Sequence, residues 1–284
     1  KWSATEGSER ELAVGMVLLA KVKATNFVEL FREASAYKEE KSVTAHGRIA
    51  GDGTLTDFAG VKLEPNGEKE ARLYLEAKPG DELNLDAKEI AAFRALKSAG
   101  GKNVVPVKEV EALVRQTLLA RYQAYRAKGL AGIAPYERAG GRHLSASDEL
   151  SLALKQMKLL ARYVPSVYTA MLSYPAATDG QKALEEHFYW LNLDLFGRPT
   201  YALSHRMLFQ VGDAFFASDR HYYTSHDYNS LQQGVTVLPT KDGMLVITLV
   251  RVSTDQVGGF GSSAKHSISR ALMGPYFIGL YETL

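Results

Sequence analysis

The sequence predicts an α+β fold, and three stretches of different periodicity carry that prediction. Residues 1–85 alternate short strand-like runs with Gly and Asp turns, residues 86–174 repeat apolar side chains at helical spacing, and the chain from about Glu185 onward alternates with period two. We therefore expect a small α+β unit at 1–85, a helical region at 86–179, and an antiparallel sheet closed by a long C-terminal helix at 180–284. The pattern leaves open whether the last two regions pack as one domain.

The composition is that of a globular protein and excludes several classes of function. Of the 284 residues, 46% are hydrophobic and 23% are charged. The 34 basic and 32 acidic residues are spread along the chain. The chain therefore lacks the basic stripe that would indicate a nucleic-acid partner. The longest apolar run near the N-terminus, residues 12–20, is shorter than the roughly 20 residues of a transmembrane helix. The absence of cysteine excludes disulfides and thiolate sites.

The N-terminal unit is expected to contain short strands and one helix. The strand-like runs are residues 16–23, 43–49, 55–63 and 71–76. Asn26 suits the N-cap of the helix, which carries Phe27 and Phe31 on one face. Strong turn signals at residues 65–67 and 78–81 separate these elements.

The helical region predicts three helices. Asp86 and Glu89 form a capping pair ahead of the first. Pro106 suits the first turn of the second helix, which ends at Gly129. The third begins after Ser145 or Ser147 and is broken or kinked at Pro165.

Five strands and a closing helix are predicted for the C-terminal region. The strands are residues 187–196, 200–211, 215–225, 231–238 and 244–253, and the helix covers 263–281. The Gly-rich segment 254–263 lies between strand and helix, where backbone amides could bind an anion. It matches no phosphate-binding motif, so we interpret it as a connection, with Asp255 or Ser262 capping the helix.

Four of the seven histidines lie in this predicted sheet, among many aromatic residues. They are His187, His205, His221 and His226. Strand parity places His205 on the face of Tyr201, Leu203, Met207 and Phe209, which indicates an inward side chain. By the same reasoning His187 and His221 are its companions, whereas His226 falls on the opposite face.

Two kinds of chemistry could use these histidines, but neither has a sequence signature. His187, His205 and His221 could converge on a metal, although the chain lacks His-x-His, His-x-x-x-His and His-Glu-x-x-His spacings. A catalytic Ser-His-Asp site assembled from distant segments is also compatible with the sequence, although the chain has no Gly-x-Ser-x-Gly motif. Glu185 and Glu186 are interpreted as solvated charges at a strand start. No catalytic residue, metal ligand or cofactor is therefore assigned.

The order of helices, five antiparallel strands, a Gly-rich turn and a long closing helix resembles the helix-grip arrangement of START and Bet v 1-like lipid-binding proteins. That resemblance covers residues 180–284 and implies an apolar cavity between the sheet and the last helix. Three further stretches look like those of an uncharacterised group of exported bacterial proteins. They are Phe188-Tyr189-Trp190, His221-Tyr-Tyr-Thr-Ser-His226 and Arg251-Val-Ser-Thr-Asp255-x-x-Gly258. The second resemblance implies a periplasmic protein.

The leading expectation is an exported protein that binds a hydrophobic or amphipathic small molecule between the C-terminal sheet and the last helix. The expected wall residues are Tyr189, His205, Phe209, His221 and Tyr223. The first alternative is a hydrolase or metal-dependent enzyme that uses His187, His205 and His221. The second is a partner-binding protein that exposes Tyr222, Tyr223 and Tyr228. A start at Lys1-Trp2 without Met favours a periplasmic or secreted location over a cytoplasmic one.

Overall fold

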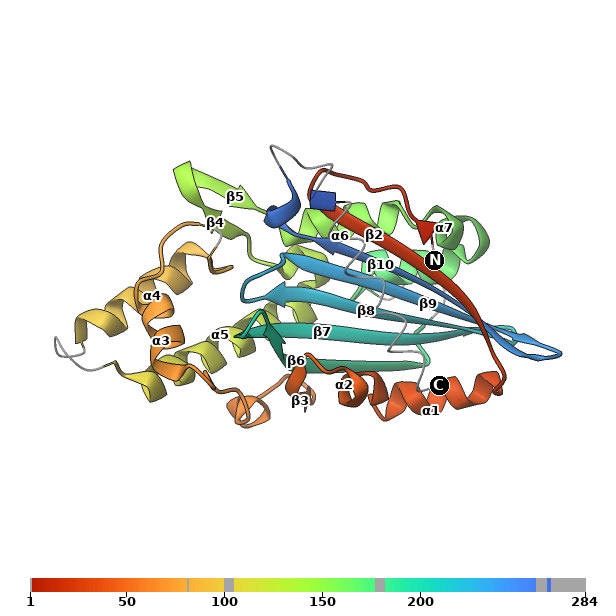
Figure 1. The fold of residues 1–284 in the computed structure, drawn as a ribbon, viewed down its shortest axis with the longest axis horizontal. Helices are drawn as coiled ribbons and strands as arrows, with labels where there is room; N and C mark the ends of the chain where they lie inside the picture. The colour runs from red at the N-terminus through yellow and green to blue at the C-terminus, as the bar shows by residue number, and fades with distance from the viewer. Residues whose placement is uncertain (1, 81, 100–104, 177–181, 259–264, 267–284) are drawn as a thin grey trace.

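The computed structural model describes residues 2–80, 82–99, 105–176, 182–258 and 265–266, and it confirms the α+β class (Figure 1). Its centre is an eight-stranded antiparallel sheet in the order β1-β2-β10-β9-β8-β7-β6-β3. Consecutive strands from the C-terminal half form a meander: β6 (Glu185–Leu195), β7 (Arg198–Val211), β8 (Ala214–Thr224), β9 (Ser230–Thr240) and β10 (Gly243–Ser253). These are the five strands that the period-two pattern predicts.

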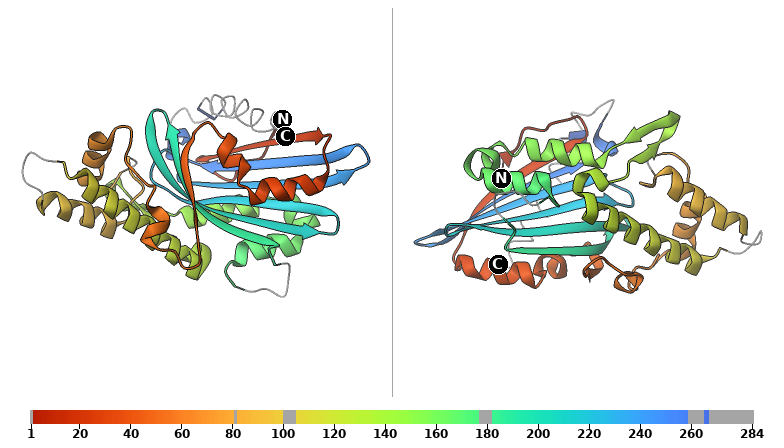
Figure 2. Two further views of the ribbon diagram at one scale, coloured as in Figure 1. Left: turned by 90° about the horizontal axis from the view of Figure 1, so that it is seen from below. Right: turned by 180° about the vertical axis from the view of Figure 1, so that it is seen from behind.

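N-terminal strands extend this meander at both edges. β2 (Glu11–Ala20) pairs with β10 and carries the short β1 (Trp2–Ser3), whereas β3 (Val43–Ile49) pairs with β6. Because β2 and β3 lie at opposite edges, the chain between them must cross the sheet. It does so as α1 (Ala24–Arg32) and α2 (Ser35–Glu39), which cover one face, called here the α1 face (Figure 2).

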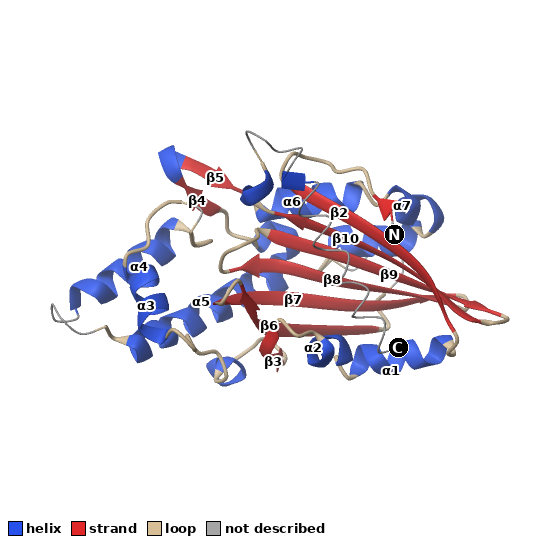
Figure 3. Cartoon of the chain, viewed as in Figure 1, coloured by secondary structure: helices blue, strands red, loops and turns tan. Residues whose placement is uncertain are grey.

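The opposite face, called here the α5 face, is covered by helices from the central region (Figure 2). They are α5 (Val107–Lys128), α6 (Ala146–Lys155), α7 (Lys158–Tyr163) and α8 (Pro165–Ser173). Beyond one end of the sheet lie α3 (Gly67–Leu75), α4 (Ala87–Ala99) and a hairpin of β4 (Tyr136–Arg138) and β5 (Arg142–Leu144) (Figure 3). Within the described ranges, every helix is too short or too polar to cross a bilayer.

Local signals placed several helix ends correctly. The capping pair before α4 is reciprocal, since the Asp86 amide donates to Glu89 and the Glu89 amide donates to Asp86, each at 2.8 Å. Ser145 accepts the Asp148 amide at the start of α6. Gly129 follows the last residue of α5 with φ +58°.

Two predicted strands were wrong. Residues 71–75 lie in α3 and Glu76 is its C-cap, because the buried side chains Ala71, Tyr74 and Leu75 follow helical and not alternating spacing. Residues 55–63 contain the 3₁₀ helix η1 (Leu55–Phe58), which begins with a capping box of Thr54 and Asp57. The predicted third helix is divided into α6, α7 and α8, with Pro165 in the first turn of α8.

The sheet is buried on both faces, because each carries a helical layer. On the α5 face, Phe188, Tyr201 and Leu203 pack with residues of α3 to α6. On the α1 face, Phe31 of α1 packs with Leu208, Phe215 and Val237. A sheet covered on both sides must hydrogen-bond its buried polar side chains internally. The closing helix predicted at 263–281 and its possible cap Ser262 lie outside the described residues, apart from 265–266.

Candidate functional site

The five predicted wall residues are divided between the two faces of the sheet. His205, Phe209 and Tyr223 lie on the α5 face. There His205 contacts Tyr125, and Tyr223 lies under the Arg121 guanidinium. Phe209 packs with Leu160 of α7 and with Val167 and Met171 of α8. Tyr189 packs edge-on against Tyr37 of α2, and His221 lies 3.7 Å from Asp219, whose carboxylate bonds to Tyr37. Tyr189 and His221 are therefore on the α1 face, and the five do not line one pocket.

Strand register explains this division. Directly paired residues of antiparallel strands share a face, and His205 pairs with Phe188 on β6 and with Arg220 on β8. His187 therefore shares its face with its partner Arg206 and not with His205. The expectation that His187 shares a face with His205 was wrong, because odd-numbered residues on different strands do not have to point to the same face of a sheet.

A β-bulge separates His221 from Tyr223. The pairing changes from Leu203 with Tyr223 to Ser204 with His221, so Tyr222 is the extra residue. As a result Tyr222 stacks on Tyr125, with ring centroids 3.8 Å apart, and Tyr223 also lies on the α5 face. Of the three residues His221, Tyr222 and Tyr223, only His221 lies on the α1 face.

The other three histidines, His187 and His221 in strands and His226 in the loop after β8, are bound to local partners. Arg48 donates to His187 Nδ1 at 2.6 Å, and His187 Nε2 lies 3.2 Å from a Glu185 oxygen. His221 Nδ1 bonds to the Tyr228 hydroxyl at 2.7 Å, and His226 Nδ1 lies 2.5 Å from Asp227. No group of three or more His, Asp or Glu side chains suitable for a metal occurs among the residues that the structure describes.

Ser204, Asp219 and His221 approach one another on the α1 face, but not as a nucleophile and base. The Ser204 hydroxyl donates to Asp219 at 2.6 Å, and His221 Nε2 is 3.7 Å from the same carboxylate oxygen. A nucleophilic serine needs its hydroxyl on the imidazole. Here the carboxylate, which also accepts from Tyr37 at 2.6 Å, binds the hydroxyl instead. In this arrangement a carboxylate and a tyrosine, and not an imidazole, hold the Ser204 hydroxyl.

His205 is confirmed as an inward residue, with no exposed surface. Phe188 stacks on its ring at a centroid distance of 4.3 Å, and the Tyr174 ring lies 4.5 Å away. Burial, followed by the charges of Arg220 and Arg126, lowers the pKa of His205 well below its ordinary value. The imidazole is therefore neutral at neutral pH.

A buried chain of hydrogen bonds fixes the tautomer of His205. Arg220 donates to the Tyr125 hydroxyl at 3.0 Å, and that hydroxyl lies 2.9 Å from His205 Nδ1. Since a guanidinium can only donate, the Tyr125 proton is free to be donated to Nδ1. The remaining proton of the imidazole is then on Nε2. That atom is buried, has no hydrogen-bond partner among the described residues, and lies 3.7 Å from Glu186 Oε1.

Glu186 belongs to a surface pocket of about 630 Å³ between α5 and the start of β6. Its lining residues are Asp52, Gln123, Arg126, Ala127, Tyr174, Pro175 and Glu186. The turn that carries Asp52 is held to α5, because the Tyr122 hydroxyl donates to Gly51 O at 2.5 Å and Gln123 donates to Asp52 O at 3.2 Å. The pocket lining combines one aromatic side chain, Tyr174, with the charged groups Asp52, Arg126 and Glu186.

Gly129 allows the far wall of the pocket to form. A Cβ at this position would lie 1.8 Å from the Tyr174 carbonyl oxygen and 3.1 Å from Pro175 Cδ. Its backbone angles, φ +58° and ψ −136°, are also poorly tolerated by other residues. Only glycine therefore lets residues 174–175 pass against the end of α5.

Glu186 lies at an exposed position at the start of β6, as the sequence indicates, but it also approaches Arg126 and His205. Its side chain is 34% exposed and lies 3.6 Å from Arg126, and the Arg126 guanidinium also lies 5.2 Å from the centre of the Phe188 ring. Burial raises the pKa of Glu186, although Arg126 and the Tyr174 hydroxyl oppose the rise. Sequence reasoning missed this residue, because only strand pairing brings it beside His205.

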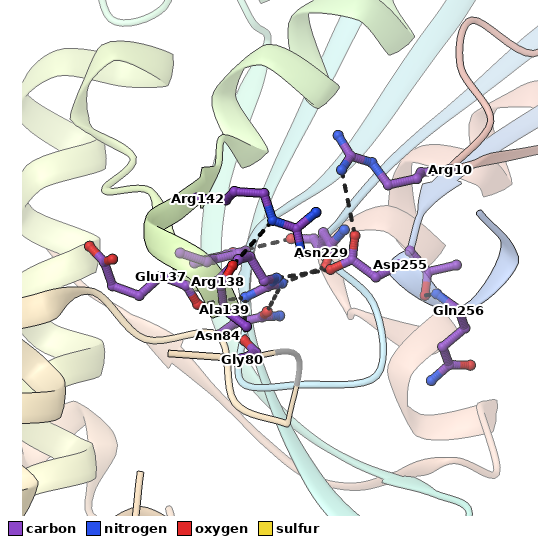
Figure 4. A network of polar contacts seen from close by, with 12 residues as sticks. Arg10, Gly80, Asn84, Glu137, Arg138, Ala139, Arg142, Asn229, Asp255 and Gln256 are labelled. Carbon is purple, nitrogen blue, oxygen red and sulfur yellow. Dashed lines mark hydrogen bonds and ion pairs between the residues drawn. The ribbon is translucent and has the colours of Figure 1, made fainter. Parts of the chain in front are cut away.

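A second polar network surrounds Arg138 at the end of the sheet near β4 (Figure 4). Arg138 donates to Asp255 at 2.9 Å, to Asn84 at 2.7 Å and to Asn229 at 3.2 Å. Thr254 accepts the Gln256 amide and caps η4 (Asp255–Val257). The predicted closing helix, for which Asp255 was a possible cap, lies outside the described residues. The guanidinium is engaged by these partners, and we interpret this network as structural.

The chain matches no protein-family model, and comparisons with curated proteins and with solved structures give no significant match.

Proposed function

We propose that the protein binds a small amphipathic molecule in the pocket between α5 and β6. The observation that carries the proposal is the buried Nε2–H of His205, which has no hydrogen-bond partner in the described structure and is directed toward Glu186 of the pocket. Binding sites commonly combine apolar walls with a few placed polar groups. Here Tyr174, Pro175 and Ala127 are the apolar part, and Arg126 and Glu186 are the charged part.

This site replaces the one expected between the C-terminal sheet and the last helix. Of the expected wall residues only His205 adjoins it, next to the lining residues Glu186 and Tyr174. The site does not require the closing helix. The helix-grip arrangement and a periplasmic location remain proposals that rest on the sequence. The exposed-tyrosine alternative is not supported, since Tyr222, Tyr223 and Tyr228 are all buried. A site built from all three histidines of the enzyme alternative is not supported, because His205 is on the opposite face from His187 and His221. On their shared face, His187 contacts Glu185 and His221 bonds to Tyr228.

Native mass spectrometry of the freshly purified chain tests the proposal, together with a thermal-shift screen of amphipathic compounds. The pocket is blocked by Ala127→Trp, because Ala127 lines it at an exposed position on α5. Ala131→Trp, also at an exposed position but outside the pocket lining, is the matched control. We expect a retained or stabilising compound with the wild type and Ala131→Trp, and its loss with Ala127→Trp. Equal behaviour of the two variants, or no compound at all, would refute the proposal.

A further inference from the structure

The aromatic cluster next to the proposed pocket contains buried hydrogen-bond donors that lack an acceptor among the described residues. Among the described residues, five buried side-chain atoms have no hydrogen-bond partner. Two of them, His205 Nε2 and the Tyr222 hydroxyl, belong to the aromatic cluster around Tyr125, beneath Tyr174. Buried donors are nearly always satisfied in folded proteins. A ligand that supplies an acceptor would satisfy at least the Nε2–H that points toward the pocket.

The charge beneath the pocket is positive. Arg220 is fully buried, and its described partners are all neutral: Gln232 at 3.0 Å, Tyr125 at 3.0 Å and the Met171 carbonyl at 2.9 Å. No carboxylate of the described residues lies within 4 Å of this guanidinium. An uncompensated buried cation favours negative charge nearby. Arg126 adds a second cation at the pocket itself.

Glu186 meets this positive charge only loosely. Its carboxylate lies 3.6 Å from Arg126 and 3.7 Å from His205 Nε2. Both distances exceed the range of about 2.7–3.2 Å that is typical of an N–H···O hydrogen bond. About a third of its side chain is exposed, so the carboxyl group has room to turn outward. Asp52, the other acid of the pocket lining, is at an exposed position, where water screens its charge.

We propose that the pocket binds the carboxylate end of its amphipathic ligand. The ligand carboxylate takes the place of the Glu186 carboxyl group: it pairs with Arg126 and accepts the Nε2–H of His205. The apolar part of the ligand lies against Tyr174 and Pro175. An amine could not make these contacts, because it offers only donors to a site that already has a surplus of donors. This inference rests on the proposed function and adds the chemical class of the ligand.

Three probes of the same length separate the possible ligand classes: hexanoate, hexanamide and hexylamine. Each is titrated into the full chain labelled with ¹⁵N, and affinity is read from NMR shifts. We expect hexanoate to bind about tenfold more tightly than hexanamide, which corresponds to about 1.4 kcal/mol for the charged contact. Hexylamine should not compete. The His205 Nε2–H signal should move downfield with hexanoate, because it gains a charged acceptor.

Two substitutions test the assignment of Arg126 and Glu186. Arg126→Gln should weaken hexanoate binding by about tenfold, whereas Arg142→Gln, at an exposed arginine outside the pocket, should leave it unchanged. Glu186→Gln should strengthen hexanoate binding, because it removes the competing negative charge. Circular dichroism and the melting temperature establish that each variant is folded.

The outcomes separate this inference from the proposed function. Binding of hexylamine that is lost in Glu186→Gln would overturn the carboxylate assignment while supporting the pocket. Hexanoate binding that is unaffected by Arg126→Gln, or that leaves the His205 signal unmoved, would overturn the assignment as well. If none of the probes binds and native mass spectrometry finds no retained compound, both proposals fail.

Discussion

Tyr125→Phe should destabilise the protein more than any other removal of a single hydroxyl group from α5. The Tyr125 hydroxyl accepts from Arg220 and bonds to His205 Nδ1, both in the buried core. Its loss leaves a charged donor and a ring nitrogen without partners, while the ring and its stacking on Tyr222 remain. A hydrogen bond to a charged group contributes about 1.5–3 kcal/mol, and an unsatisfied buried atom costs about 1–3 kcal/mol. We expect the free energy of unfolding to fall by about 3 kcal/mol.

Tyr122→Phe, one turn earlier on the same helix, is the matched control. Its hydroxyl donates to the neutral carbonyl of Gly51 at 2.5 Å, so its removal should cost only about 1 kcal/mol. Urea unfolding followed by both fluorescence and circular dichroism measures the difference, and coincident transitions support a two-state treatment. If Tyr125→Phe costs no more than Tyr122→Phe, the hydrogen-bonded chain does not hold Arg220, and the tautomer assigned to His205 loses its basis.

Two further substitutions test the energetics of buried groups. Glu149 is buried on α6, where burial raises its pKa to about 7 against hydrogen bonds from Asn229 and Ser230. An acid whose pKa rises on folding stabilises the folded state at low pH and loses that contribution as pH rises through the folded pKa. The stability of wild type relative to Glu149→Gln should therefore fall by up to about 3 kcal/mol between acidic and neutral pH, and a constant difference would contradict this account. Gly129→Ala should cost about 3 kcal/mol or more in urea unfolding, since it adds a backbone clash to strain. Gly140→Ala, with φ +74° but open space around its Cβ position, should cost only about 1 kcal/mol, and equal costs would show that contact with Tyr174 is unimportant.

The sequence predicted elements whose signals are local. Long alternating runs gave the five strands of the meander, and the Asp86–Glu89 pair and Gly129 marked helix ends. Short segments were ambiguous, because a run such as residues 71–76 contains too few positions to distinguish alternation from helical spacing. The addition of β2 and β3 to opposite edges of the sheet depends on tertiary pairing, for which the sequence has no local signal.

The candidate site was less predictable than the fold. The inward position of His205 follows from alternation within one strand, and it was confirmed. Its relation to the other histidines depends on register and on the bulge at Tyr222, which a single sequence does not reveal. Arg126 and Glu186 carry ordinary surface-type side chains on a helix and at a strand start. Their convergence depends on the packing of α5 against the sheet, which brings Arg126 within 3.6 Å of Glu186.

The cross-strand pair of His205 and Arg220 explains why the site holds a fixed donor. Both side chains are fully buried, on the same face, and directly opposite each other on β7 and β8. Two positive charges in that position would repel in a medium of low polarity. Arg220 cannot lose its proton, so His205 must remain neutral, in agreement with its lowered pKa. A neutral imidazole whose Nδ1 is occupied by Tyr125 can offer only one group to the pocket, the Nε2–H. His205 is therefore suited to recognising an acceptor and unsuited to transferring protons at neutral pH, which favours a binding site over an acid–base catalyst here.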